Sequence, residues 1–415
     1  MNNFKYSNSI LINLIISSII PFLIWGPFFP DLIVSVSTIF FLYYVFKNKD
    51  FYYLFNKQFF IFFSFCIYCI FLSIFVAKDT LLSFESSLFY FRIGVFSCFI
   101  WYLVDKDKSI ITYFYYALTI CFLALVVDGY FQYFTGKNLL GYKLIGIRVS
   151  SFFGDELILG SYLARLFPLL FALFLYKKKK IFEVYFIALL FILVDILVYM
   201  SAERTSFFFL NLSTLFIIIL IKEYQKFRLV TFILAIICIF ALSFKSPNLS
   251  DRMFVGPAKT MGLIESSSEP TIFSPTHDSW IRSAYKMFKD QPLLGHGPKM
   301  FRIMCKDEKY KSSSKPCMSH PHNFYVQLLA ETGIIGFLFL FSTLGYVLFS
   351  AVRQFKCIIF KQKRVFTDYQ VCLLAGMLIT VWPLSTNGNF FNNWLMIIYC
   401  LPVGFYLQSI YSKKD

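Results

Sequence analysis

The chain has 415 residues, of which 58% are hydrophobic and 21% aromatic, whereas only 15% are charged. A water-soluble protein of this length could not bury so much apolar surface, and the mean hydropathy of +0.67 indicates a membrane protein. The net charge of +16 does not indicate a nucleic-acid partner, because no basic stripe interleaved with aromatic residues occurs in a soluble segment.

The apolar runs along the chain predict an all-α, polytopic membrane protein with about twelve transmembrane helices. No cleavable signal peptide is expected, because the first apolar run leads into the second without a small-residue cleavage site. The expected spans are 8–25, 31–46, 59–76, 88–104, 109–134, 156–176, 181–200, 205–221, 229–244, 324–350, 369–386 and 394–411.

Lysine and arginine predict the orientation of these spans, because the short cytoplasmic loops of membrane proteins are enriched in both. With the N-terminus in the cytoplasm, the cytoplasmic segments hold 20 Lys and Arg, including the run 177–180, against 5 in the short outer loops. Both termini are then cytoplasmic. The chain is expected to divide into helices 1–9 (1–244), a periplasmic catalytic loop (245–323) and helices 10–12 (324–415).

The loop contains all four histidines of the chain: His277, His296, His320 and His322. Its early part is rich in Ser, Pro and Gly and is expected to be irregular. From Asp278 onward, apolar residues at helical spacing predict a helix that is capped by Asp278 or Ser279 and ends at Gln291-Pro292. Cys305 and Cys317 lie in a polar segment of the loop and are a plausible disulfide if that segment is extracytoplasmic.

A polar stripe opens the tenth span, where Asn323, Gln327 and Glu331 recur every four residues and share one helical face. The carboxylate of Glu331 should face protein or a wet cavity rather than lipid. Simple hydrogen bonding between helices is the other explanation of the stripe. Gly333 and Gly336 should permit the close approach of a neighbouring helix.

Arginines are expected on the same side of the membrane as the histidines: Arg148, Arg204, Arg252, Arg282 and Arg302. Two more, Arg92 and Arg165, lie inside expected spans, where an arginine marks either a functional site or a structural pair. Because guanidinium groups bind phosphate with paired hydrogen bonds, the cluster indicates a lipid-linked anionic substrate such as a diphosphate. A histidine could then act as the general base that takes a proton from an acceptor hydroxyl.

Metal binding is the sharpest competing use of the histidines. His320 and His322 could hold zinc together with another histidine or the cysteines, but their spacing matches none of the usual zinc patterns. We therefore expect no metal and no cofactor. His277 and His296 are expected to serve mainly as caps and hydrogen-bonding groups.

Three segments together resemble one known family, the bacterial O-antigen ligases and their polymerase relatives. His322-Asn323, followed by nine residues and then Gly333-Ile-Ile-Gly336, is similar to the family signature H-[N/S/Q]-x9-G-x-x-G. The loop segment W-I-R-S-A-Y-K-M-F-K-D-Q-P-L-L-G-H-G-P resembles the family's Arg-bearing helix and turn. S-A-E-R-T-S at 201–206 resembles its Arg turn between two spans, except that Glu203 stands where small polar residues are common.

This resemblance implies an inverting, metal-independent glycosyltransferase whose donor is an undecaprenyl-diphosphate-linked glycan. It implies that His322 is the essential base and that Arg204 and Arg282 bind the diphosphate. We assign His322 as the catalytic residue, and we assign substrate binding to a larger set: Arg204, Arg282, Arg165, Arg148, Asn323 and Glu331.

The resulting interpretation is an O-antigen ligase-type enzyme of the bacterial inner membrane whose active site faces the periplasm. It would transfer a glycan to a sugar hydroxyl of lipid A–core, with membrane lipids as its surroundings. A polymerase that joins lipid-linked repeat units needs the same base and the same diphosphate site, so it is kept as the alternative. A polysaccharide flippase or exporter is less favoured, because the polar groups gather at one face instead of along the spans.

Overall fold

Helices make up the regular structure of the protein. The computed structural model describes residues 2–176, 179–265, 270–313 and 317–412, so that Lys177 and Lys178 of the basic run lie outside the described residues. Within these ranges the only β-structure is a pair of isolated bridges in 137–148. The helices are α1 (Asn2–Ser17), α2 (Ile19–Trp25), α3 (Phe28–Asn48), α4 (Lys57–Phe75), α5 (Thr80–Ser87), α6 (Phe91–Lys106), α7 (Ser109–Thr135), η1 (Ser151–Phe153), α8 (Leu159–Leu175), α9 (Ile181–Met200), α10 (Arg204–Leu220), α11 (Gln225–Lys245), α12 (Pro247–Ser250), η2 (Asp251–Val255), α13 (Gly256–Thr260), α14 (Pro275–Asp290), α15 (Phe301–Met304), α16 (Phe324–Ile359), α17 (Asp368–Thr380) and α18 (Asn393–Tyr411).

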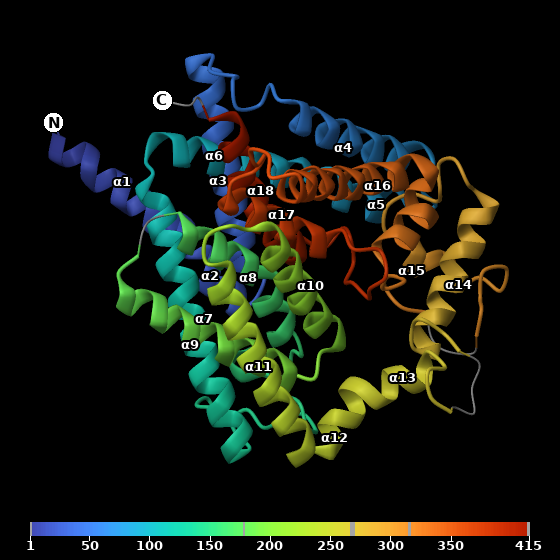
Figure 1. Ribbon diagram of the computed structural model, residues 1–415. Coiled ribbons are helices and arrows are strands. Elements are labelled where there is room, and N and C mark those ends of the chain that lie inside the picture. The colour runs from blue at the N-terminus through green and yellow to red at the C-terminus, as the bar shows by residue number, and fades with distance from the viewer. Residues whose placement is uncertain (1, 177–178, 266–269, 314–316, 413–415) are drawn as a thin grey trace.

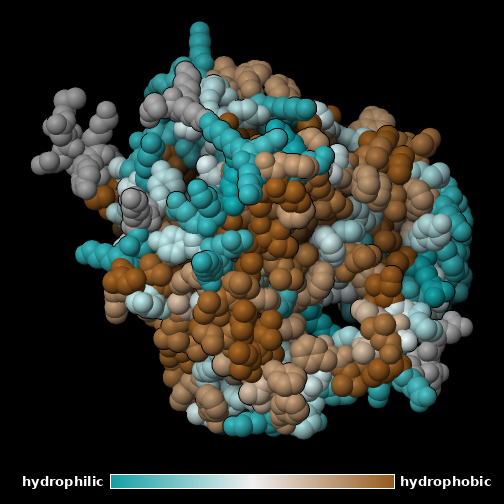
Figure 2. Space-filling view, in the orientation of Figure 1, coloured by the Kyte–Doolittle hydropathy of each residue, from teal (hydrophilic) through white to brown (hydrophobic). Residues whose placement is uncertain are grey.

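The expected fold class, a polytopic all-α membrane protein, is confirmed. In the described part of the chain, 8 helical segments are long and apolar enough to cross a membrane, and four shorter apolar helices match the remaining expected spans. Figure 2 shows hydrophobic side chains over much of the visible surface, as expected where helices face lipid. The interior is also apolar, and α8 lies at its centre with almost all of its residues buried (Figure 1).

Segments that were expected on one side of the membrane contact one another. At one end of the bundle, the backbone N–H of Lys222 donates to Asp368, and the side chain of Gln408 donates to Asp105. At the other end, Arg148 donates to the carbonyl of Ser201. The polar connections of the bundle therefore form two groups, one at each end.

Two ion pairs, one buried and one partly exposed, tie membrane helices together. Arg228 in α11 is fully buried and pairs with Asp195 of α9 at 3.0 Å. Arg92 in α6 pairs in the same way with Asp31 of α3. A carboxylate compensates for the cost of placing each of these charges among apolar side chains.

The loop after α11 is more helical than expected. Residues 247–260 form a continuous helical run through α12, η2 and α13, because Leu249 and Met253 pack against apolar residues at the α9–α10 turn and on α11. The next helix, α14, begins at Pro275 and not at Asp278. Ser274 caps it by accepting a hydrogen bond from the backbone N–H of His277, so the predicted caps Asp278 and Ser279 were wrong.

The buried face of α14 covers a small apolar core above α16. This core contains Ala284, Met287, Phe301, Tyr310 and Ala330. The structure joins the nearby Cys305 and Cys317 in a disulfide. The loop therefore has a small apolar core of its own, and this core packs against the membrane helix α16.

The helix α16 is interrupted at Gly333, which has a left-handed backbone (φ 63°). The loop turn after α14 fills this break. The backbone N–H groups of His296 and Gly297 donate to the carbonyls of Ala330 (3.0 Å) and Glu331 (2.8 Å), and that of Ile334 donates to Pro292 (2.9 Å). We had expected Gly333 to receive a neighbouring helix, but it receives this turn, because its missing side chain leaves room for the Leu293 carbonyl.

We therefore expect Gly333→Ala to release the loop from α16. The new methyl group would overlap the Leu293 carbonyl oxygen, and the positive φ alone costs roughly 1–3 kcal/mol for a residue with a side chain. Limited proteolysis of the purified protein should show faster cleavage of the loop, and thermal unfolding should occur at a lower temperature.

Gly345→Ala is the matched control, because Gly345 lies on the same helix and no atom is within 4 Å of the position of its added methyl group. This variant should be neutral or slightly more stable, since Ala is the better helix former. Equal cleavage rates in the two variants would contradict the docking of the turn at Gly333.

Candidate functional site

His322 lies at the junction of loop and membrane helix, directly before Asn323, which caps α16. Its backbone is in the left-handed region (φ 59°), which is uncommon for a residue with a side chain and often occurs at functional sites. The ring stacks on Trp280 of α14 at 5.1 Å between centroids. The rings of His320 and His277 lie 4.1 and 4.9 Å away. Nε2 of His322 is buried and has no hydrogen-bond partner among the described residues.

Burial keeps the imidazoles of His320 and His322 neutral. Desolvation, together with charge repulsion from the neighbouring histidines, lowers the pKa of His322 to about 3. The pKa of His320 falls to about 4 for the same reason, with a contribution from the charge of Arg302. At neutral pH, His322 is therefore unprotonated, and its bare nitrogen can accept a proton from a bound hydroxyl group.

Asn387 connects His322 to the membrane helices. Its backbone N–H donates to the carbonyl of His322 at 2.8 Å, and its side-chain oxygen accepts a hydrogen bond from Arg165 of α8 at 3.0 Å. The side chain of Asn323 also binds this segment, donating to the carbonyls of Pro383 and Ser385. Asn387 therefore links His322, the candidate base, to the cation Arg165 through two hydrogen bonds.

Sequence reasoning missed this segment. The eleventh span was expected to continue to residue 386, but α17 ends at Thr380, shortly before Pro383, which cannot continue a helix. The signal that could have revealed it is the polar run 385–389, which is unusual between the last two apolar spans of such an apolar chain.

Arg165 is a buried arginine of α8. Its guanidinium lies between the rings of Phe209 and Tyr399, 4.7 and 4.6 Å from their centroids. It is 5% exposed, and its Nη1 atom has no hydrogen-bond partner within the described residues. Unlike Arg92 and Arg228, it forms no ion pair with any carboxylate in the described ranges. A buried cation without an anion is costly, so this position suits a bound anion.

A second group of arginines surrounds the turn between α9 and α10. Arg148 donates to the carbonyl of Ser201, and Arg252 donates to that of Ala202 at 3.1 Å. Arg204 donates from Nε to the carbonyl of Arg252 at 2.6 Å. Burial, together with the charge of Arg252, lowers the pKa of Arg148. Three guanidinium groups are therefore concentrated here, which is an electrostatic environment favourable to an anion.

Glu203 does not neutralise Arg204. Its carboxylate accepts hydrogen bonds from the backbone N–H groups of Gly160 (2.7 Å) and Ser161 (3.0 Å) at the start of α8. Burial raises the pKa of Glu203 to about 7 despite these hydrogen bonds. Glu203 therefore caps the start of α8 although it lies far away in the sequence. It links the α9–α10 turn to the helix that carries Arg165.

The structure does not bring Arg282 beside His322. The side chain of Arg282 is 65% exposed and pairs with Asp278 at 2.6 Å. Trp280 faces His322, and a residue two positions further along a helix points about 160° away. The arginines predicted to bind substrate are thus divided: Arg165 is linked to His322 through Asn387, Arg148 and Arg204 share the α9–α10 turn, and Arg282 lies on the outside of α14.

The side chains of the polar stripe are occupied within the protein. Glu331 is fully buried, and its carboxylate accepts hydrogen bonds from the backbone N–H of Phe301 and the side chain of Gln327, both at 2.9 Å. Gln327 also binds Asn389 and the backbone N–H of Phe390. The stripe therefore joins the loop, α16 and the segment before α18.

The arrangement allows proton transfer and anion binding side by side. His322 provides an unprotonated nitrogen, and Arg165 provides a positive charge whose Nη1 atom has no hydrogen-bond partner in the described ranges. Within the described ranges, no three His, Cys, Asp or Glu side chains are grouped so that they could hold a metal ion. The ring of His322 packs against the rings of His277 and His320.

Comparison with known proteins identifies the family. Residues 187–341 match the family model described as O-antigen ligase, a match that covers somewhat more than a third of the chain and includes Arg204, Arg282 and His322. A search of curated proteins finds no match to the chain. The match supports the family predicted from the three sequence motifs, and residues 187–341 carry an O-antigen ligase domain.

Proposed function

We propose that this protein is an O-antigen ligase-type glycosyltransferase. It would transfer a glycan from undecaprenyl diphosphate to a sugar hydroxyl of lipid A–core, at the periplasmic face of the inner membrane. The family domain supports this general class of activity. The observation that carries the proposal is the bridge through Asn387, which holds the free nitrogen of His322 and the unpaired Arg165 in one buried unit.

In the proposed reaction, the acceptor hydroxyl donates a hydrogen bond to Nε2 of His322. The hydroxyl oxygen attacks the anomeric carbon of the donor from the side opposite the diphosphate, and its proton passes to His322. The bond between the anomeric carbon and the diphosphate oxygen breaks, and the diphosphate leaves with the electron pair. Attack from the opposite side inverts the configuration at the anomeric carbon.

Arg165 would stabilise the negative charge that develops on the leaving diphosphate. A preorganised cation in a site that excludes water is effective, because little reorganisation is needed during the reaction. Arg148 and Arg204 would bind the more distant phosphate oxygens. The proposal assigns this electrostatic role to arginines, and it assigns none to a metal ion or another cofactor.

Donor binding would also increase the basicity of His322. In the empty site, burial keeps the pKa of His322 low, and a bound dianion would stabilise the protonated imidazole. The histidine would therefore become an effective base only when the donor is in place. This coupling limits the transfer of a proton when no donor is present.

The other predicted substrate ligands have different places in this proposal. Arg282, exposed on α14, would meet the donor at the edge of the site, where Asp278 now holds it. Asn323 and Glu331 would act mainly through the protein, because Asn323 fixes the start of α16 beside His322 and Glu331 anchors the loop.

Reconstitution tests the function directly. The purified protein would be placed in liposomes with a polyprenyl-diphosphate glycan, with and without lipid A–core. A single transfer to the core supports a ligase. A ladder of products on the carrier lipid indicates the alternative, a polymerase, which uses the same base and the same leaving group. No transfer to either acceptor would contradict both.

His322→Ala should lower the rate in this assay by about 10²–10⁴-fold, the usual contribution of a general base. His296→Gln is the matched control, because His296 lies in the same loop but its ring contacts Met287 and Tyr310 and not the proposed site. The control should keep most of its activity. Near-normal transfer by His322→Ala would rule out the proposed base.

Arg165→Met should lose activity without losing stability. The substitution removes a buried charge that has no carboxylate partner, so thermal unfolding should occur at the same temperature or higher, while transfer falls by at least about 10²-fold. Arg228→Met is the control, because it leaves Asp195 buried and unpaired and should unfold at a lower temperature. If Arg165→Met is the less stable of the two and still transfers glycan, Arg165 has a structural role.

A further inference from the structure

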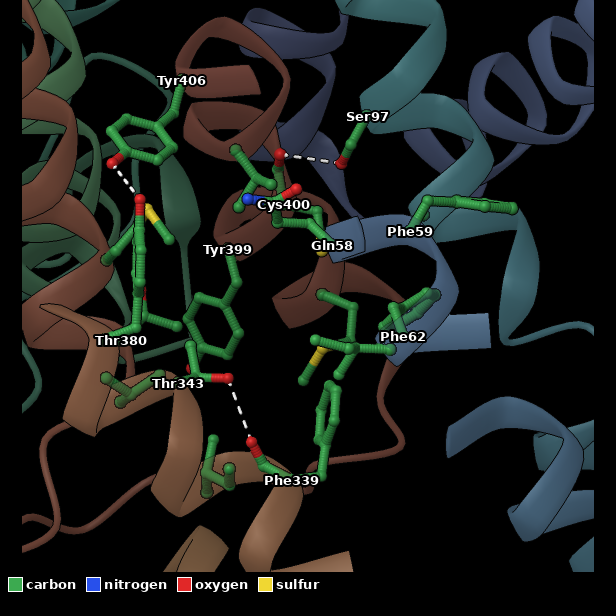
Figure 3. A pocket seen from close by; sticks show the side chains of 18 of the residues that line it. Gln58, Phe59, Phe62, Ser97, Phe339, Thr343, Thr380, Tyr399, Cys400 and Tyr406 are labelled. Carbon is green, nitrogen blue, oxygen red and sulfur yellow. Dashed lines mark hydrogen bonds between the residues drawn. The ribbon is translucent and has the colours of Figure 1, made fainter. Parts of the chain in front are cut away.

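A large cavity lies within the membrane-spanning part of the protein, and no arginine or histidine of the described residues lines it (Figure 3). It has a volume of about 450 Å³, within the usual range for ligand sites, which is about 300–1,000 Å³. Aromatic and aliphatic side chains form most of its wall, and Lys57 is the one charged residue that lines it in the described part of the chain. The wall is formed by α4, α6, α16, α17 and α18.

The cavity is elongated along α18. The residues of α18 that line it follow a helical stripe: Met396, Tyr399, Cys400, Val403, Tyr406 and Leu407. From Met396 to Leu407, this stripe covers about 16 Å, or roughly half of the ~30 Å hydrocarbon core of a membrane. A space of this shape suits one extended hydrocarbon chain.

One end of the cavity adjoins the proposed active site. The ring of Tyr399 lines the cavity and also lies 4.6 Å from the guanidinium carbon of Arg165. Phe324, which also lines the cavity, is two residues from His322, and its ring contacts Tyr399. The hydroxyl of Tyr399 is buried without a hydrogen-bond partner in the described ranges, so a polar atom is available at this end.

A cavity of this kind needs an apolar occupant. Protein interiors contain few voids larger than a water molecule, and apolar cavities do not hold water stably. The outer faces of the surrounding helices are lipid-facing in character, with exposed side chains such as Ile67 and Phe71 on α4 and Phe341 on α16. Because the cavity is not fully enclosed, a lipid chain can reach it from the membrane.

We propose that the cavity binds the isoprenoid tail of the lipid diphosphate donor, with the diphosphate end at Tyr399 and Arg165. This inference rests on the proposed function. A polyprenyl diphosphate has a single chain bonded directly to phosphate, so its head and its first isoprene units can occupy adjoining sites. A glycerophospholipid has two chains, and a glycerol unit separates them from the phosphate.

Two substitutions would fill the cavity from opposite walls, Val403→Trp on α18 and Thr343→Trp on α16. Wild-type protein should prefer a long-chain polyprenyl donor over a donor with a single five-carbon prenyl group by at least about tenfold in kcat/KM. In both variants this preference should disappear through a higher KM for the long-chain donor. The kinetics with the short-chain donor should stay close to those of the wild type.

Val352→Trp is the matched control, since Val352 also lies on α16 but is 51% exposed and does not line the cavity. It should keep the wild-type preference. An unchanged preference in Val403→Trp and Thr343→Trp would overturn the proposal, as would equal losses with both donors.

Photo-crosslinking separates this proposal from the proposed function, because it requires no catalysis. Protein in lipid nanodiscs would be labelled with a diazirine-tagged polyprenyl phosphate or with a diazirine-tagged phosphatidylglycerol. The polyprenyl probe should label α16 and α18 at the cavity, and Val403→Trp should abolish this labelling while Val352→Trp retains it. Equal labelling of the cavity by phosphatidylglycerol would show that it holds ordinary acyl chains. Specific labelling without any glycan transfer would support the proposed lipid-binding cavity and contradict the proposed glycosyltransferase activity.

Discussion

The break in α16 at Gly333 determines the position of the functional groups around it. At this break, the helix exchanges its own backbone hydrogen bonds for bonds to the turn that follows α14. The exchange satisfies carbonyl groups that would otherwise be unpaired within the bundle, so the loop cannot shift without exposing them. Docked in this way, α14 presents Trp280 to the ring of His322. The buried carboxylate of Glu331 adds a second attachment, to the backbone of Phe301.

Charge compensation distinguishes the structural arginines from the functional candidate. Arg92 and Arg228 lie among membrane helices and each has an aspartate partner, which accounts for their presence. Arg165 is also buried, but it forms no ion pair in the described ranges: its hydrogen bonds go to the neutral side chains of Asn387 and Ser161, and its guanidinium lies between two aromatic rings. Its positive charge is therefore available to bind an anion. A site that stabilises a leaving diphosphate needs this property, because a cation already paired with a carboxylate gains less from the reaction.

The fold was largely predictable from the sequence, and the site was predictable only in part. Hydrophobicity alone located the spans, since each span must satisfy its backbone internally and face apolar surroundings. The motif around His322 also indicated the family, and the family domain confirms it. The partners of each charged group were not predictable, because they are far apart in the chain and meet only through packing. Examples are the pairs Arg228–Asp195 and Arg165–Asn387. For the same reason, the turn at Gly333 was mistaken for a helix contact, and the segment before α18 was mistaken for part of a helix.

The central claim is that Arg165 and His322, joined through Asn387, act on the two sides of the same scissile bond. The most direct measurement is a cryo-EM structure of the protein in lipid nanodiscs with a polyprenyl diphosphate bound. The mechanism predicts phosphate oxygens within hydrogen-bond distance of the free Nη1 of Arg165, with Nε2 of His322 facing the acceptor side. Phosphate density on the outside of α14 at Arg282, with Arg165 still unliganded, would contradict it.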